Sequence, residues 1–192
     1  MIETFDFTTY PILETSRLKM RKLSRFDAQA IFEVRNDYQV TKYNIVDAYT
    51  NIEQARNLIR NIQSEYVERK TIRWGITVKP NDKIVGMVGF NYWDRNDHRA
   101  AIGFDLRQDH WRKSFMTEAV REVIRFGFQN MGLNRIEADA SIYNVGSVML
   151  LQNIGFTQEG IQREQYYEDG NYHDLVLFAL LKREWQSEDF KL

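Results

Sequence analysis

Residues 100–128 constrain the fold more than any other stretch of the chain. An apolar run at 100–106 predicts a short strand, and apolar residues at helical spacing after Thr117 predict a long amphipathic helix. Arg112 and Lys113 lie in the turn between them. A helix that starts directly after a strand and a tight turn presents free backbone N–H groups at the positive end of its dipole. The junction therefore predicts an anion site, and the alternative is an ordinary connection with solvated basic side chains.

The rest of the chain alternates strand and helix patterns, with 36–49 expected to be a loop. Strands are predicted at 17–23, 74–78, 84–92, 100–106, 135–142, 156–167 and 175–181, and helices at 24–34, 51–66, 117–131 and 145–154. Asn144 and Gly155 bracket the last helix as N-cap and terminating glycine. Asp169-Gly170 is a favoured hairpin turn. This order predicts an α+β (mixed α/β) fold in which about seven mostly antiparallel strands and about four helices share one core.

Composition excludes several classes of protein. The chain has 192 residues, 43% hydrophobic and 28% charged, which suits one domain over residues 1–192 with a core at about 15–185. A net charge of -1 gives no general basic field for nucleic acid, and the absence of cysteine excludes disulfides, thiol nucleophiles and cysteine-ligated zinc. His98, His110 and His173 lack metal-ligand spacing. Neither a secretory signal nor a membrane-spanning run is recognisable, so we expect a cytoplasmic protein that binds neither membrane nor metal.

Several short motifs follow one another in an order typical of one family. They are Thr15-Ser16-Arg17-Leu18, Trp74-Gly75-Ile76, Ile102-Gly103-Phe104, Trp111, Met116-Thr117-Glu118-Ala119-Val120, Leu133-Asn134-Arg135-Ile136-Glu137-Ala138, Asn144, Ser147, Gly155-Phe156, Glu159-Gly160, Arg163-Glu164 and Gly170-Asn171-Tyr172-His173-Asp174. In this order and spacing the chain resembles the GCN5-related N-acetyltransferase (GNAT) superfamily. More narrowly, it resembles the RimJ/RimL-type acetyltransferases of ribosomal-protein N-termini.

The resemblance implies a splayed central sheet that holds acetyl-CoA between two diverging strands. The pantetheine arm would pair with the backbone along 102–106. The pyrophosphate would bind backbone amides at 112–117, where the residues themselves predict an anion site. Asn144 would contact the pantetheine, although it serves equally well as a plain N-cap. The cofactor-binding candidates are Phe104, Asp105, Leu106, Arg112, Lys113, Ser114, Phe115, Met116, Thr117 and Asn144.

The phosphate-binding turn departs from the family pattern. Relatives usually have glycines here, in a pattern like W-G-K-G-Y, whereas this chain reads Trp111-Arg112-Lys113-Ser114-Phe115. Glycine permits backbone angles that other residues adopt only at a cost of roughly 1–3 kcal/mol. Backbone amides survive such substitutions, however, and the Ser114 hydroxyl and the Arg112 charge add to the site. We therefore expect acetyl-CoA binding to be retained.

Acetyl transfer to an amine needs a base for the amine and a proton for the leaving thiolate. The resemblance makes Glu159 the candidate base, with Glu137 as the alternative, and Ser147 the candidate proton donor. Many relatives use a tyrosine seven residues after the position of Asn144, but this chain has Leu151 there. The competing structural roles are a solvated strand residue for Glu137 and first-turn hydrogen bonding for Ser147.

These residues favour an acyltransferase that moves the acetyl group of acetyl-CoA to a primary amine. The favoured acceptor is the N-terminal α-amino group of a protein, such as a ribosomal protein, because a neutral α-amine is easier to form at pH 7 than a neutral lysine. A small amine, such as a polyamine, amino acid or drug, is the second hypothesis. A non-catalytic acyl-CoA-binding regulatory module is the third, motivated by the missing glycines. The acceptor's identity and a homodimeric state are left open.

Overall fold

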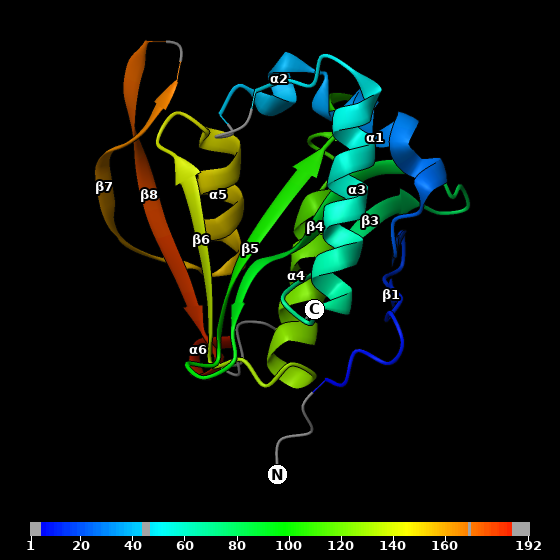
Figure 1. The fold of residues 1–192 in the computed structure, drawn as a ribbon. Helices are drawn as coiled ribbons and strands as arrows, with labels where there is room; N and C mark the ends of the chain where they lie inside the picture. The colour runs from blue at the N-terminus through cyan, green and yellow to red at the C-terminus, as the bar shows by residue number, and fades with distance from the viewer. Residues whose placement is uncertain (1–4, 44–46, 169, 186–192) are drawn as a thin grey trace.

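An eight-stranded sheet runs through the computed structural model, which describes residues 5–43, 47–168 and 170–185 (Figure 1). Its strands are β1 (Leu13–Glu14), β2 (Leu18–Arg21), β3 (Ile72–Val78), β4 (Ile84–Asp94), β5 (Arg99–Leu106), β6 (Arg135–Ser141), β7 (Thr157–Glu168) and β8 (Asn171–Leu181). The spatial order is β1-β2-β3-β4-β5-β6-β8-β7, and every neighbouring pair is antiparallel except β5 and β6. The predicted mixed fold is confirmed, with β1 as an eighth strand too short to be read from periodicity.

Four longer helices accompany the sheet, as predicted. They are α1 (Ala28–Arg35), α3 (Ile52–Val67), α4 (Phe115–Gln129) and α5 (Val145–Ile154). Two four-residue helices, α2 (Tyr38–Thr41) and α6 (Lys182–Trp185), are additions. The first of them interrupts the segment expected to be a loop, because the Asp37 side chain accepts a hydrogen bond from the Gln39 N–H and so caps a helical turn.

Local capping signals decide where the longer helices begin and end. Asn51 starts α3 through a reciprocal capping box with Gln54. Asn144 caps α5, and Gly155 ends it with a φ of 105°. In contrast, α4 starts two residues before the predicted Thr117, because Ser114 takes the left-handed conformation directly before the helix. The second residue of the predicted hairpin turn, Gly170, has a φ of 80°, whereas Asp169 lies outside the described residues.

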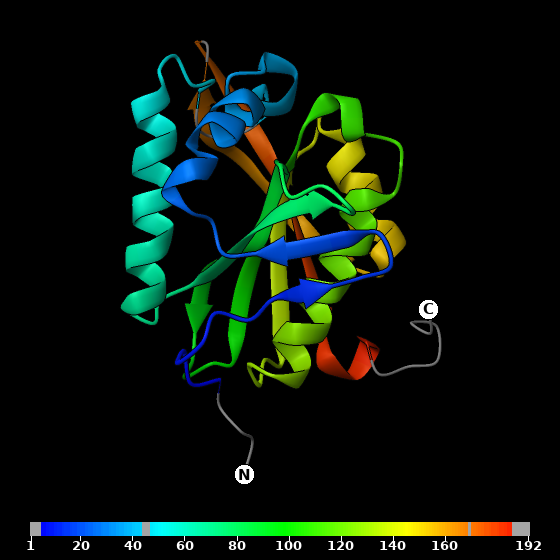
Figure 2. The ribbon, with the colours of Figure 1, turned by 90° about the vertical axis from the view of Figure 1, so that its right-hand side faces the viewer.

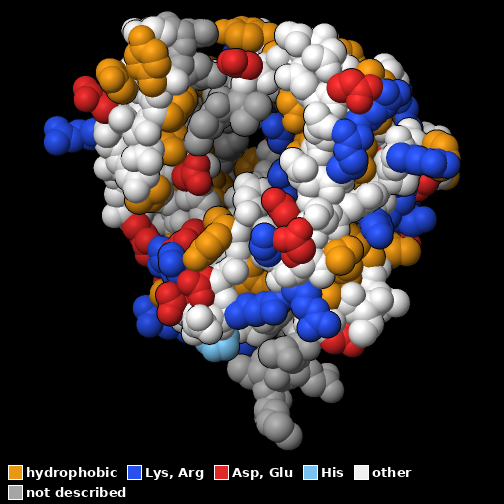
Figure 3. All heavy atoms as spheres, in the orientation of Figure 1, with side chains coloured by type: hydrophobic (Ala, Val, Ile, Leu, Met, Phe, Trp, Pro, Cys, Tyr) orange, Lys and Arg blue, Asp and Glu red, His pale blue; other side chains and the backbone are white. Residues whose placement is uncertain are grey.

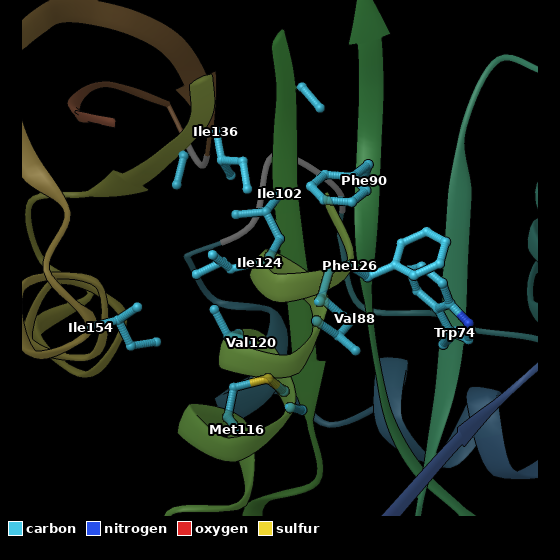
Figure 4. Close-up of a cluster of buried hydrophobic side chains, with 14 of the residues drawn as sticks. Trp74, Val88, Phe90, Ile102, Met116, Val120, Ile124, Phe126, Ile136 and Ile154 are labelled. Atoms are coloured by element: carbon cyan, nitrogen blue, oxygen red, sulfur yellow. The ribbon is translucent and has the colours of Figure 1, made fainter. Parts of the chain in front are cut away.

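Helices cover both faces of the sheet, with α1 and α3 on one face and α4 and α5 on the other (Figure 2). The larger core lies between the sheet and α4 and includes Trp74, Phe90, Ile102, Val120 and Ile124 (Figure 4). The smaller core lies under α1 and α3 and includes Ile31, Ile59 and Met87. Because successive strand residues point to opposite faces, residues next to those in the larger core point toward α1 and α3.

The sheet splits between its two parallel strands. β5 and β6 pair only at residues 99–101 against residues 135–137. Farther along, β5 stays paired with β4 up to Leu106, and β6 stays paired with β8 up to Ser141. The two halves of the sheet therefore diverge as a V (Figure 1), and the predicted separation of these strands is confirmed.

Candidate active site

The turn between β5 and α4 contains two non-glycine residues in the left-handed region. Arg112 and Ser114 have φ angles of 59° and 60°, and they occupy the positions where the resembled family usually has glycine. The Trp111 indole anchors the turn by donating from Nε1 to the Leu106 carbonyl over 2.7 Å. Left-handed residues in a turn can direct neighbouring N–H groups toward one side, which creates an anion-binding concavity. The turn thus keeps a glycine-favoured conformation without glycine.

The start of α4 leaves its backbone donors available. Ser114 is the N-cap residue, but its side chain makes no capping hydrogen bond. The first N–H groups of a helix have no intrahelical acceptor. Arg112 and Lys113 are exposed beside them, whereas the Met116 side chain is buried in the core. The candidates at 112–117 are therefore brought together at one end of α4, and this donor set fits a pyrophosphate.

Arg17, which lies between β1 and β2, and Glu118, in the first turns of α4, brace this turn. Arg17 donates from Nε to Glu118 Oε2 over 2.7 Å and from Nη1 to the Lys113 carbonyl over 3.0 Å. The Thr15 hydroxyl donates to the same carboxylate. Partial burial alone would raise the pKa of Glu118, but the hydrogen bonds from Thr15 and Arg17 outweigh it and lower the pKa. Two motifs of the resemblance, far apart in sequence, therefore meet at the base of the turn.

The diverging edge of β5 fits the pantetheine arm. Within the described residues, β5 has no strand partner on the β6 side after Ala101. Its backbone groups along 102–106 can therefore pair with the amides of a bound molecule. Phe104 and Asp105 also line the cleft described next, whereas the Leu106 side chain is buried in the core.

A polar cleft of about 210 Å³ opens where β5 and β6 diverge. Its lining includes Arg35 of α1, Arg73 of β3, Asp105 of β5, Asp139 of β6, and Asn144 and Ser147 at the start of α5. The cleft therefore reaches from the α1 side of the split sheet to the α5 side. Figure 3 shows the hollow between the two halves of the sheet.

Two arginines and one aspartate form the wall of the cleft toward α1. Arg35 Nη2 lies 2.6 Å from Asp105 Oδ2, and both side chains are buried. Arg73 lines the same wall, and burial lowers the pKa of its guanidinium despite the nearby Asp105 carboxylate. The Nε atoms of both arginines are buried without a hydrogen-bond partner. This polar cluster was missed by the sequence analysis, because its members are far apart in the chain.

Asp139 provides a carboxyl group on the opposite wall. It is reached by solvent through the cleft, yet its partial removal from bulk water raises the pKa of the side chain. A raised pKa suits a carboxylate that must accept a proton near neutral pH. Asp139 follows Glu137 by two residues, so both point to the same face of β6. That alternation was the available signal, and the resemblance directed attention to other residues instead.

The two glutamates expected to supply the base lie away from the cleft. Glu159 and Glu137 both accept hydrogen bonds from Arg135, Glu159 over 2.8 Å from Nη1 and Glu137 over 2.8 Å from Nε. The Arg135 hydrogen bonds hold the pKa of Glu159 below its ordinary value. Arg135 belongs to the paired end of β5 and β6, before the strands diverge. This position argues against Glu159 and Glu137 as bases, because an ion-paired carboxylate outside the cleft accepts a proton poorly.

Ser147 and Asn144 do lie together at the cleft. Asn144 Oδ1 accepts a hydrogen bond from the Ser147 N–H over 3.1 Å. Asn144 therefore has the helix-capping role that the sequence offered as the alternative to pantetheine contact. Both residues also line the cleft, which leaves the Ser147 hydroxyl available to a bound molecule. The capping and ligand-binding roles of this pair are therefore compatible.

The histidines have structural contacts elsewhere. His110 Nδ1 lies 2.7 Å from Asp109 Oδ1, and His173 stacks on Tyr166. Over the described ranges, no cluster of three or more acidic or histidine side chains could hold a metal ion. None of the helices that the structure describes has the length and apolarity needed to cross a membrane.

Comparison with known proteins identifies the class of this molecule. Residues 17–157 match the family model of the acetyltransferase (GNAT) domain, and the chain belongs to this family. It is 39% identical over 173 residues to p20 of Bacillus licheniformis, an uncharacterized N-acetyltransferase, covering 90% of this chain and 97% of p20. The protein is therefore an acetyl-CoA-dependent N-acetyltransferase.

Two further likenesses concern ribosomal proteins. The chain is 32% identical over 108 residues to the alanine N-acetyltransferase of ribosomal protein uS5 from Escherichia coli strain K12, covering 55% of this chain and 56% of that protein. Among solved structures, RimL, a ribosomal L7/L12 α-N-protein acetyltransferase in complex with coenzyme A, superposes with a TM-score of 0.81 at 17% identity. That superposition covers 89% of this chain and 98% of RimL and shows the same fold.

Proposed function

We propose that this enzyme acetylates the N-terminal α-amino groups of proteins, with ribosomal proteins as the favoured class. The observation that carries the proposal is the Asp139 carboxyl group, which lies in the cleft with a raised pKa. The neutral form of an α-amine costs only about 1.0–1.4 kcal/mol at pH 7, whereas that of a lysine costs about 4.6 kcal/mol. A single carboxylate base is adequate for the first acceptor and weak for the second. The relatives that act on uS5 and L7/L12 support the same acceptor class.

Acetyl-CoA binding is assigned to two backbone features, the unpaired edge of β5 and the turn that follows this strand. The pyrophosphate binds the amides at 112–117, with Arg112 and Lys113 beside it. The pantetheine pairs with the free edge of β5 along 102–106, and Asn144 contacts it from α5. This arrangement carries the thioester into the cleft between β5 and β6, where Asp139 and Ser147 lie.

The chemistry then requires one proton to leave the amine and one to reach the thiolate. The amine nitrogen attacks the thioester carbonyl, whose developing charge is stabilised by N–H groups of β5. Asp139 accepts the proton from the attacking nitrogen, directly or through a water molecule. The carbon–sulfur bond breaks, and the Ser147 hydroxyl passes a proton to the leaving thiolate while it takes one from water, to which Asp139 releases the proton that it accepted. An amide and free coenzyme A are the products.

A panel of acceptors tests the proposal through thiol release from acetyl-CoA. The panel contains peptides with a free α-amine and no lysine, the same peptides with a blocked α-amine and an added lysine, and spermidine. We expect turnover with the first group at least ten times higher in kcat/KM than with the others. A preference for spermidine would establish a small-amine acetyltransferase instead. Acetyl-CoA binding by calorimetry without turnover of any acceptor would establish a non-catalytic module.

A further inference from the structure

We propose that the α1-side wall of the cleft is a carboxylate-binding subsite, and that the acceptor amine carries a carboxylate that Arg73 binds. This inference rests on the proposed function and refines it, because it states what accompanies the amine in the acceptor. The carboxylate is either the α-carboxylate of a small amino acid or the side chain of an acidic residue near a protein N-terminus.

Cations outnumber anions among the side chains with which this wall lines the cleft. Arg35 and Arg73 carry two positive charges, and Asp105 carries one negative charge in the same wall. Arg35 forms the close ion pair with Asp105. Glu65 also lies near Arg73, but it is outside the cleft lining and accepts a hydrogen bond from the Thr71 hydroxyl over 3.1 Å. Asp139 lies on the opposite wall of the cleft, so the α1-side wall by itself lines the cleft with two cations and one anion.

Arg73 is the residue that carries the excess charge. In the part of the chain that the structure describes, its Nε is buried without a partner, and no hydrogen bond or ion pair engages its guanidinium. Among the described residues no ion pair or hydrogen bond joins Arg73 to Asp139, although both line the cleft. The Arg73 side chain is partly exposed, but its Nε is withdrawn from water. A buried donor without a partner is unfavourable, and the planar donors of a guanidinium match a carboxylate.

The anion that completes this wall belongs to the acceptor rather than to acetyl-CoA. Arg73 is adjacent in sequence to Trp74, which packs against α4, so Arg73 points to the opposite face, toward α1 and α3. The phosphate-binding turn lies at the start of α4, on the other face of the sheet. The pantetheine and the thioester carry no charge. The acceptor enters the cleft with its amine at Asp139 and its carboxylate at Arg73.

The experiment compares acceptors that differ only in one charge. In the first arm, C-terminally amidated peptides begin with aspartate or asparagine. In the second arm, free alanine is compared with alaninamide. Binding to the CoA-saturated enzyme is measured by calorimetry, so that no turnover is needed, and kcat/KM is then measured with acetyl-CoA. We expect the carboxylate form of one pair to bind about tenfold or more tightly than its neutral form.

Variants assign this preference to Arg73. Arg73→Gln should reduce the binding ratio of the preferred pair to about one, and Arg73→Lys should retain part of it. Arg60→Gln, on the exposed face of α3, is the matched control and should keep the wild-type ratio. Folding is checked by thermal unfolding and acetyl-CoA binding. If Arg73→Gln does not fold, the ratios of wild type and Arg73→Lys decide.

The outcomes separate the inference from the proposed function. Equal binding of both members of both pairs by the wild-type enzyme would overturn the carboxylate subsite, as would a preference that Arg73→Gln retains. A preference in the peptide arm supports protein N-termini with an acidic residue, whereas a preference confined to the alanine arm would retain the subsite and replace the proposed protein acceptor by a free amino acid. Tight binding of a carboxylate form without acetylation of any α-amine would retain the subsite and reject the proposed function.

Discussion

The proposed phosphate-binding turn and the proposed acceptor cleft both lie toward the C-terminal end of β5, but they are built in different ways. The turn is formed by consecutive residues, 107–114, followed directly by the start of α4. The cleft takes Arg35, Arg73, Asp105 and Asp139 from α1 and three strands. One site is therefore a property of a short segment, and the other exists only after the sheet and α1 have assembled.

This difference separates general binding from specific binding. The turn offers backbone N–H groups, which any residue except proline supplies, so Arg112 and Ser114 replace glycines without changing the donors. The cleft offers side-chain charges, and each of these can be lost by one substitution. The turn should therefore tolerate sequence change and hold an invariant ligand, whereas the cleft should determine the acceptor.

The largest effect is expected in the cleft, at Asp139. Asp139→Asn should lower kcat/KM by about 100- to 10,000-fold, because it removes the general base without changing the side-chain volume. Acetyl-CoA affinity should stay at the wild-type value. As the pH decreases through the raised pKa of Asp139, the wild-type rate should fall more steeply than protonation of the amine alone would cause. The variant should show only the dependence due to the amine. The measurement is a pH–rate profile with a free-α-amine peptide.

Glu159→Gln is the matched control for this variant, and its rates should remain within about threefold of wild type because its carboxylate lies outside the cleft. Wild-type rates in Asp139→Asn, with a loss in Glu159→Gln, would assign the base to Glu159 instead.

The folding stability of Asp139→Asn gives an independent check on the raised pKa. A folded-state pKa above the unfolded value means that the ionised form, above that pKa, destabilises the fold. Asp139→Asn should therefore be at least as stable as wild type at pH 7 in urea denaturation.

The next effect is on stability, at the Arg35–Asp105 pair. Arg35→Leu should lower the free energy of unfolding by about 3 kcal/mol, because the Asp105 carboxylate stays buried after its ion-pair partner has been removed. The double variant Arg35→Leu/Asp105→Asn should recover at least half of the loss. Lys79→Leu, at the exposed pair with Glu14, is the control and should change stability by less than about 1 kcal/mol. Equal losses in the single and double variants would mean that the pair is not what stabilises the wall.

The same contrast explains how much could be predicted from the sequence. Strands and longer helices have periodic patterns and caps such as Asn51 and Asn144, so their positions were predicted within a few residues. The turn between β5 and α4 was predicted because a strand, a basic turn and an amphipathic helix are consecutive in the chain, whereas the divergence of β5 and β6 was implied by the family resemblance. Phosphate binding by this turn stays a prediction. β1, α2 and α6 were missed, since two to four residues carry no periodicity.

The acceptor cleft could not be predicted in the same way. Nothing local distinguishes Arg73 in β3 from a solvated strand residue, and its role depends on how β3, β5 and α1 pack. For the base, the alternation of Glu137 and Asp139 places both on one face of β6. Only the point where β6 leaves β5 distinguishes them, because Glu137 lies in the paired section and Asp139 lies beyond it.

A smaller effect is expected at the phosphate-binding turn. Arg112→Glu combined with Lys113→Glu should weaken coenzyme A binding by about tenfold or more, because two charges beside an anion are reversed. The loss should shrink at high salt, since both side chains are exposed. Arg56→Glu/Arg60→Glu, on the exposed face of α3, makes the same change in net charge and should leave affinity unchanged. Affinity is measured by calorimetry. Unchanged affinity in the first variant would show that the phosphates of coenzyme A do not bind at residues 112–117.

The smallest effect tests whether the turn is shaped by its own residues. Ser114→Gly relieves a left-handed φ of 60° but increases the entropy of the unfolded chain, so the free energy of unfolding should change by less than about 0.5 kcal/mol. Arg121→Gly, at an exposed interior position of α4, should lose about 0.8–1.0 kcal/mol. Urea denaturation of both variants measures the difference. An equal loss would show that glycine relieves no strain at position 114. The left-handed conformation would then cost the folded chain little, and the replacement of the family's glycines in this turn would need no compensation from contacts such as the Arg17 hydrogen bond to the Lys113 carbonyl.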